Sequence, residues 1–229
     1  NQTALMFVYY LITRWKELGK INGKEYIVKT IVTTETIKTI AERNGVEMYD
    51  VYTGFKWIAN VMRENEGKKN YIGGGEESYG FLCEDFVRDK DAVSACVILA
   101  EIAAWAKDQG LSLYQLLQKI YVEYGFSKEK GISVVKKGKS GAEEIEAMMK
   151  KFRENPLTEI AGSKVTYFYD YSTLKGKDYA ENETVTLDMP TTSNVLQYFT
   201  EDNTKVSIRP SGTEPKIKFY CEVHSKVKS

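Results

Sequence analysis

Residues 26–65, YIVKTIVTTETIKTIAERNGVEMYDVYTGFKWIANVMREN, decide the fold of this 229-residue chain. Residues 26–33 are rich in β-branched side chains and predict a strand. Helical spacing of apolar residues follows over 34–44, a second strand over 46–52, and a second helix over 55–65. Strands and helices in alternation imply a parallel sheet with helices on both faces.

The flanking sequence extends the same alternation. A helix over residues 4–18 precedes the first strand, and a short strand at 71–72 runs into three glycines. A long apolar helix then spans 89–107 and is closed by Gly110. We therefore expect an α/β domain with a parallel sheet over residues 1–110.

The second half has a different pattern. Ser112 and Gln115 form a capping box that begins a helix over 113–124. We expect a loop over 173–190, and further elements at residues 132–135 (strand), 142–152 (helix), 165–171, 194–199, 206–209 and 217–223 (strands). This pattern predicts a smaller α+β domain over 111–229 with a mainly antiparallel sheet.

Composition limits the classes of partner. Lys and Arg number 32 and Asp and Glu number 32, so no global field steers the chain to nucleic acid or to an anionic membrane. No apolar run approaches the ~18 residues of a membrane span, and the N-terminus has no basic leader. The three widely spaced cysteines favour reduced thiols in the cytoplasm. The single histidine, His224, is assigned no role.

Residues 209–218, RPSGTEPKIK, have the composition of a phosphate cradle. Arg209 offers a planar, permanently charged fork of donors. Ser211 and Thr213 add hydroxyls, and Gly212 lets the backbone approach an anion closely. Lys218 adds positive charge on the strand that follows. The alternative interpretation is an ordinary surface turn, since Pro, Ser, Gly and Thr are common turn residues.

Residues 73–80, GGGEESYG, form a second unusual loop. Three glycines predict unusual backbone angles at the end of a strand. Glu76 and Ser78 point the same way if the segment stays extended, and a carboxylate beside a hydroxyl suits the vicinal hydroxyls of a sugar. The alternative is a flexible glycine turn with solvated acids.

Two further segments are weaker candidates. Lys90, in residues 88–91 (RDKD), is placed to reach a phosphate or sugar oxygen, although Asp89 or Asp91 alone explains the segment as a helix cap. Thr53 and Gly54 offer backbone groups to a ligand, or simply precede the helix at 55–65.

Taken together, these segments resemble the third and fourth domains of the α-D-phosphohexomutases, the phosphoglucomutase and phosphomannomutase group. The resemblance covers essentially the whole chain. It rests on the order and spacing of residues 27–32 (IVKTIV), 53–56 (TGFK), 75–80 (GEESYG), 88–91 (RDKD) and 209–215 (RPSGTEP).

The resemblance implies roles for particular residues. Glu76 and Ser78 match the sugar-binding pair of the third domain. The other matches are Thr53, Gly54 and Lys90 to substrate-contacting positions, and Arg209, Ser211, Gly212 and Thr213 to the phosphate-binding loop of the fourth domain. Lys218 falls where many members have arginine, so it keeps the charge and loses the bidentate fork.

Two family segments are missing from the sequence. Members carry a phosphorylated serine in the first domain and a magnesium loop of three aspartates in the second, and neither pattern occurs here. The resemblance therefore implies the C-terminal half of a four-domain enzyme. It implies no catalytic residue and no metal ligand in this chain, with Mg²⁺ held by the missing N-terminal domains.

The implied parent is a cytoplasmic phosphohexomutase that interconverts hexose 1-phosphate and hexose 6-phosphate. Its mechanism uses a phosphoserine and a hexose bisphosphate intermediate, and this chain supplies recognition of the sugar phosphate only. The alternatives are a phosphopentomutase and a stand-alone sugar-phosphate-binding module. A purely structural protein leaves the glycine-rich loop unexplained.

Overall fold

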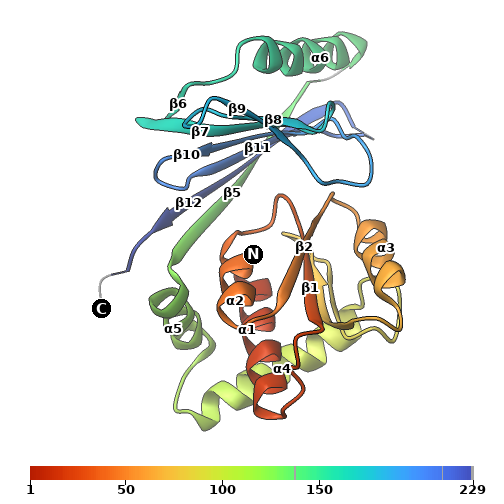
Figure 1. Cartoon of the computed structure of the whole chain (residues 1–229), viewed down its shortest axis with the longest axis vertical. Helices are drawn as coiled ribbons and strands as arrows, with labels where there is room; N and C mark the ends of the chain where they lie inside the picture. Colours follow the sequence, from red (N-terminus) through yellow and green to blue (C-terminus); the bar gives the residue numbers. More distant parts are fainter. Residues whose placement is uncertain (137, 213, 228–229) are drawn as a thin grey trace. The chain divides into compact units, whose positions relative to one another are not determined.

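The structure is a computed structural model that describes residues 1–136, 138–212 and 214–227. The chain divides into two compact units, shown in Figure 1. Unit 1 comprises Asn1–Phe126 and the end of the chain from Lys226, and unit 2 comprises Ser127–Ser225.

Unit 1 is built on a four-stranded sheet with the order β2-β1-β3-β4. Strand β1 (Glu25–Thr30) runs parallel to both β2 (Glu47–Val51) and β3 (Asn70–Gly75). The predicted α/β class with parallel strands is confirmed. The sequence did not predict β4 (Phe81–Cys83), which pairs antiparallel with β3 and makes the sheet mixed.

Helices cover both faces of this sheet. Alternation along the strands sends Ile27 and Ile72 into one core, with α1 (Gln2–Glu17), α2 (Thr36–Arg43), α4 (Ala92–Asp108) and α5 (Leu113–Tyr124). The opposite face, with Tyr26, Val28 and Tyr71, packs against α3 (Phe55–Asn65). Figure 1 shows α3 on the far side of the sheet from α1 and α2.

The three glycines of β3 lie within the strand, and their backbone is not left-handed. The predicted unusual angles are therefore wrong, and close packing is the reason for glycine. A Cβ on Gly74 would lie 2.3 Å from the carbonyl oxygen of Val28 and 2.8 Å from the Tyr71 hydroxyl oxygen. A Cβ on Gly75 would lie 2.3 Å from the carbonyl oxygen of Gly80.

Unit 2 is built on an eight-stranded sheet in which β10 pairs antiparallel with β7 and β11, and β11 with β12. The strands run in the order β5-β12-β11-β10-β7-β8-β9, and β6 pairs with β7. Their bounds are β5 Phe126–Val135, β6 Glu159–Ile160, β7 Ser163–Asp170, β8 Lys175–Asp178, β9 Glu183–Thr186, β10 Leu196–Thr200, β11 Lys205–Pro210 and β12 Lys216–Ser225. The predicted mainly antiparallel α+β class is confirmed.

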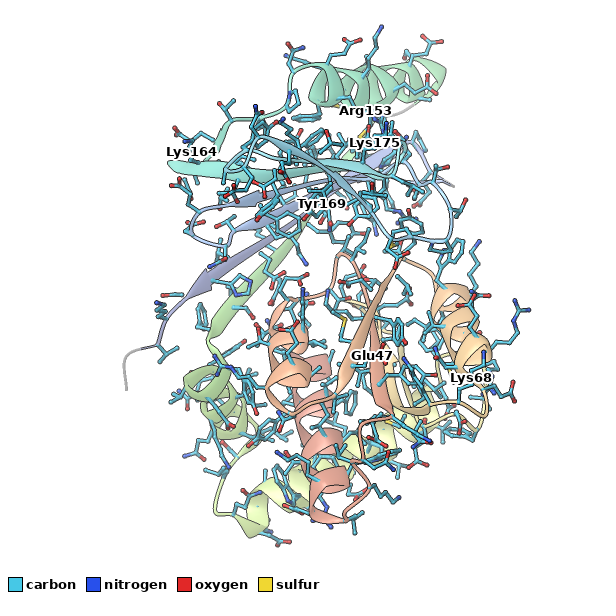
Figure 2. The ribbon with its side chains drawn as sticks, in the orientation of Figure 1. Glu47, Lys68, Arg153, Lys164, Tyr169 and Lys175 are labelled. Carbon is cyan, nitrogen blue, oxygen red and sulfur yellow. The ribbon has the colours of Figure 1, made fainter. Side chains whose placement is uncertain are left out.

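One face of the unit 2 sheet is covered by α6 (Gly138–Glu154), as Figure 1 shows. Ile145 and Met149 of the helix pack against Leu196 and Tyr198 of the sheet. Tyr169 lies on the other face (Figure 2). The ion pair between Arg153 Nε and Asp170 Oδ2, 3.1 Å apart, ties the end of α6 to β7.

The structure also corrects the expected loop and the expected domain boundary. The expected loop at 173–190 contains the hairpin of β8 and β9, whose Gly176 leaves room for Tyr169: a Cβ there would lie 2.4 Å from the ring. The division between units falls after Phe126 rather than near residue 110, because α5 packs in the first core through Leu116 and Ile120. Over the described residues, no helix is long and apolar enough to span a membrane.

Candidate functional site

Two turns of unit 1 meet at the carboxyl edge of the sheet. Strands β2 and β3 are both parallel to β1, so the turns that follow Val51 and Gly75 leave from the same edge. The backbone N–H of Gly54 donates to Oε1 of Glu76 at 2.9 Å. Gly54 has φ +113°, a conformation that favours glycine. The structure therefore joins two predicted segments, residues 53–54 and 76–80, through one charge-assisted hydrogen bond.

The loop at residues 76–80 is a closed turn. The Glu76 N–H donates to the Gly80 carbonyl at 2.8 Å, and Tyr79 has φ +56° with its side chain fully exposed. The prediction that Glu76 and Ser78 point the same way assumed an extended segment, and that assumption is wrong. A Cβ on Gly80 would lie 2.5 Å from Glu76 Oε2, so glycine leaves space for the carboxylate. Glu76 and Ser78 nonetheless line one cavity of about 480 Å³.

Lys90 lies in a second cavity of about 970 Å³, which Gly54 also lines. Its Nζ is 3.1 Å from Asp89 Oδ1 and 5.9 Å from the centroid of the Phe55 ring. Hydrogen bonds from Lys90 lower the pKa of the Asp89 carboxyl. Asp91 is the helix cap, because its side chain accepts the Ser94 N–H at 2.8 Å. Because Asp91 caps α4, Lys90 is not needed to begin the helix. The Lys90 side chain is half-exposed.

A buried lysine at the same edge was missed by the sequence analysis. Lys29, near the end of β1, has its Nζ 2.6 Å from Asp50 Oδ1 and 3.0 Å from Glu35 Oε1. Burial lowers the pKa of Lys29, but the two carboxylates outweigh burial and raise it above its ordinary value. Lys29 is opposite Asp50 on one side and Gly75 on the other, so it supports both turns. A lysine inside an otherwise apolar strand was the available signal.

The phosphate loop of unit 2 connects β11 to β12. The Ser211 N–H donates to the Lys216 carbonyl at 2.8 Å, and the Glu214 N–H to Ser211 Oγ at 3.3 Å. A Cβ on Gly212 would meet no heavy atom within 4 Å, so this glycine is not required by packing. Thr213 lies outside the described residues.

Two cations face each other across this hairpin. Arg209 and Lys218 are directly opposed in the antiparallel register, where like charges are destabilising. Over the part of the chain that is described, neither forms an ion pair with a carboxylate, whereas Lys216 pairs with Glu214. Lys218 Nζ instead lies 5.9 Å from the centroid of the Tyr220 ring. An anion placed between Arg209 and Lys218 would relieve their repulsion.

The described side chains do not fit a metal centre. Within residues 1–136, 138–212 and 214–227, no three His, Cys, Asp or Glu side chains gather to hold an ion. The chemistry available here is hydrogen bonding and charge neutralisation of a polar, anionic ligand.

Family models match both units. The phosphoglucomutase/phosphomannomutase α/β/α domain III matches residues 1–124, and the C-terminal domain of the same family matches residues 133–228. The chain belongs to the phosphoglucomutase/phosphomannomutase family. The resemblance drawn from the loops is confirmed.

Curated relatives extend this family assignment. A phosphoglucomutase of Staphylococcus haemolyticus is 34% identical over 98% of this chain and 40% of its own length. A phosphoglucomutase of Staphylococcus aureus is 37% identical over 97% of this chain and 39% of its own length. The chain thus spans about two fifths of the relatives it matches.

Solved structures share the fold. Parafusin, an exocytosis-sensitive phosphoprotein and phosphoglucomutase from Paramecium, superposes with a TM-score of 0.62 at 16% identity, over 98% of this chain and 36% of its own. A phosphomannomutase-like protein from Thermus thermophilus gives 0.62 at 17% identity, over 98% and 36%.

Proposed function

We propose that this chain is the sugar-phosphate recognition part of a mutase that interconverts hexose 1-phosphate and hexose 6-phosphate. The observation that carries the proposal is the opposed pair Arg209 and Lys218 at the end of a hairpin loop. Two cations held face to face lower the free energy of a bound phosphate, because the anion replaces their repulsion with attraction.

Different loops recognise the phosphate and the sugar. Arg209, Ser211, Gly212, Thr213 and Lys218 bind the phosphate that is not being transferred. Glu76 accepts hydrogen bonds from sugar hydroxyls, and its bond from Gly54 fixes the carboxylate before the ligand arrives.

The remaining predicted positions complete the sugar site. Ser78 lies with Glu76 around one cavity, and adds a hydroxyl donor and acceptor. Thr53 and Gly54 offer turn backbone, and Lys90 offers a cation at the neighbouring cavity that Gly54 also lines.

The phosphoryl chemistry belongs to a region outside this chain. We place the phosphoserine, the magnesium ion and the exchange of the bisphosphate intermediate in N-terminal domains of a longer polypeptide, which is cytoplasmic. Magnesium supplies charge neutralisation during phosphoryl transfer. Glucose is the proposed sugar, because the relatives at 34% and 37% identity are named phosphoglucomutases.

The test uses the polypeptide extended through the region upstream of Asn1, assayed with glucose 1-phosphate, mannose 1-phosphate and ribose 1-phosphate. Glu76→Ala should lower kcat/KM in both reaction directions, since the carboxylate meets a sugar hydroxyl in either orientation. Loss of one charge-assisted hydrogen bond costs about 1.5–3 kcal/mol, roughly a 10- to 150-fold decrease.

Each outcome has a distinct meaning. Preference for ribose 1-phosphate would make the parent a phosphopentomutase. Binding of sugar phosphate without turnover in the extended polypeptide would indicate a stand-alone binding module. An unchanged kcat/KM in both directions would remove Glu76 from the site.

A further inference from the structure

A tyrosine stands in the turn of residues 76–80 at a position where the backbone favours glycine. Tyr79 has φ +56°, in the left-handed region that most side chains avoid. The turn around it is closed, because the Glu76 N–H donates to the Gly80 carbonyl at 2.8 Å. Tyrosine in this conformation therefore has a cost in free energy that glycine would not have.

Packing among the described residues does not offset this cost. The Tyr79 side chain is 105% exposed, and within the part of the chain that the structure describes it makes no hydrogen bond, ion pair or ring contact. Nearby positions with a steric or backbone requirement do hold glycine: Gly80 leaves space for the Glu76 carboxylate, and Gly54 has φ +113°. Neither the turn nor the core accounts for an aromatic ring at residue 79.

The Tyr79 ring lies at the rim of the cavity that Glu76 and Ser78 also line. The volume of about 480 Å³ is in the range of small-molecule sites. A hexose in its six-membered ring form has hydroxyl groups around its edge and C–H groups on its faces. Glu76 and Ser78 suit the hydroxyl edge, and an aromatic ring suits a C–H face, because apolar groups pack on its π surface.

We infer that Tyr79 is a further sugar-contacting residue, whose ring stacks on the C–H face of the hexose while Glu76 and Ser78 bind its hydroxyls. The inference rests on the proposed function, in which this cavity takes the sugar. Stacking is less directional than hydrogen bonding, so one ring serves both orientations that interconversion of the 1-phosphate and the 6-phosphate requires. A six-membered ring also offers more C–H area than a five-membered one, so Tyr79 favours hexose over pentose.

The kinetic test uses the polypeptide extended upstream of Asn1. Tyr79→Gly should raise KM for glucose 1-phosphate and for glucose 6-phosphate on the order of tenfold, because the apolar contact is lost. Tyr79→Phe keeps the ring, so its KM values should stay within about twofold. Inorganic phosphate has no sugar face, so its inhibition constant should be the same in all three proteins.

Thermal stability separates a ligand contact from a structural role. Tyr79→Gly should melt at or slightly above the unsubstituted 229-residue chain, because glycine relieves the left-handed strain. Glu84→Gly is the matched control, since Glu84 has φ +58°, is exposed and lines neither of the two cavities described above. It should relieve strain in the same way and leave both KM values unchanged.

Several results would overturn the inference. One is an unchanged KM in Tyr79→Gly, and another is a Tyr79→Phe variant as impaired as Tyr79→Gly. A lower melting temperature of Tyr79→Gly, in the 229-residue chain or in the extended polypeptide, would assign the ring to a structural contact. A parallel loss of inhibition by phosphate would assign the effect to displacement of the turn.

The proposed function is tested separately by the Glu76→Ala variant. If Glu76→Ala lowers kcat/KM while Tyr79→Gly changes nothing, the function stands and only the inference fails. If the unsubstituted extended polypeptide neither binds nor turns over a hexose phosphate, the function fails and the inference fails with it.

Discussion

Single atoms decide which side chain is tolerated at the centre of unit 1. Gly74 lies where β3 runs beside β1, and an added Cβ would meet the Val28 carbonyl oxygen at 2.3 Å. That neighbour is backbone in the middle of a parallel ladder, so it moves only if the ladder moves.

Gly74→Ala should therefore destabilise the chain by about 2–3 kcal/mol, the cost of overpacking a rigid core. Gly131→Ala is the control, because a Cβ at that exposed position of β5 has no heavy atom within 4 Å. Urea unfolding of both variants measures the difference in free energy. A Gly74→Ala variant as stable as Gly131→Ala would mean that the strands are not this close.

At the residue scale, local chemistry was predictable and long-range chemistry was not. The Ser112–Gln115 capping box is complete, because both partners lie within one turn of helix. The bond from Gly54 to Glu76 and the pairing of Lys29 with Asp50 join residues 21 or 22 positions apart. Such pairs depend on strand order, which single residues do not reveal.

Turns that link strands depend on similar local bonds. Between β10 and β11, the Asp202 carboxylate accepts hydrogen bonds from the Thr200 hydroxyl and the Thr204 N–H. These hydrogen bonds lower the pKa of Asp202 to about 2 from an ordinary value of 3.8. Because the folded value is the lower one, the bonds stabilise the fold above about pH 4 and lose that effect as the pH falls toward 2.

Asp202→Asn should therefore melt below the unsubstituted chain at neutral pH and together with it near pH 2. The difference should stay below about 1 kcal/mol, because Asp202 is exposed and solvent screens its charge. Thermal melts of both proteins from pH 2 to pH 7 make the comparison. A gap that widens on acidification would contradict the assignment.

At the element scale, helices were predicted more completely than strands. The predicted helix at 55–65 coincides with α3. The spacing of its apolar residues, the glycine that precedes it and the polar residues at its end all indicate the same bounds. Strands β4, β8 and β9 were missed because all three are short, and β8 and β9 also contain charged residues. Pairing stabilises them rather than their own composition: β4 pairs with β3, β8 with β7, and β9 with β8.

The whole molecule consists of two units with separate hydrophobic cores. The cores of unit 1 include residues from α1 to α5, and the core of unit 2 lies between α6 and its own sheet. The domain boundary near residue 110 followed from a helix stop at Gly110, which is a real turn with φ +72° but not the end of the unit.

Each unit should fold when expressed alone, because the described cores share no residue. We expect residues 1–126 and 127–225 to show cooperative thermal unfolding by circular dichroism. If 127–225 lacked a cooperative transition while 1–126 showed one, the second core would be too small to fold independently.

Recognition of phosphate by the loop from Arg209 to Lys218 is the central claim, and phosphate titration of the 229-residue chain followed by amide NMR tests it most directly. Amide shifts should centre on residues 209–218, with a dissociation constant on the order of millimolar. Arg209→Ala should abolish the shifts, and Arg209→Lys should restore them partly, because a point charge does not replace the fork. Gly212→Ala should keep the fold, since its Cβ has open space, and weaken binding by blocking the backbone. Shifts centred elsewhere, or equal binding by Arg209→Ala, would show that the loop is only a turn.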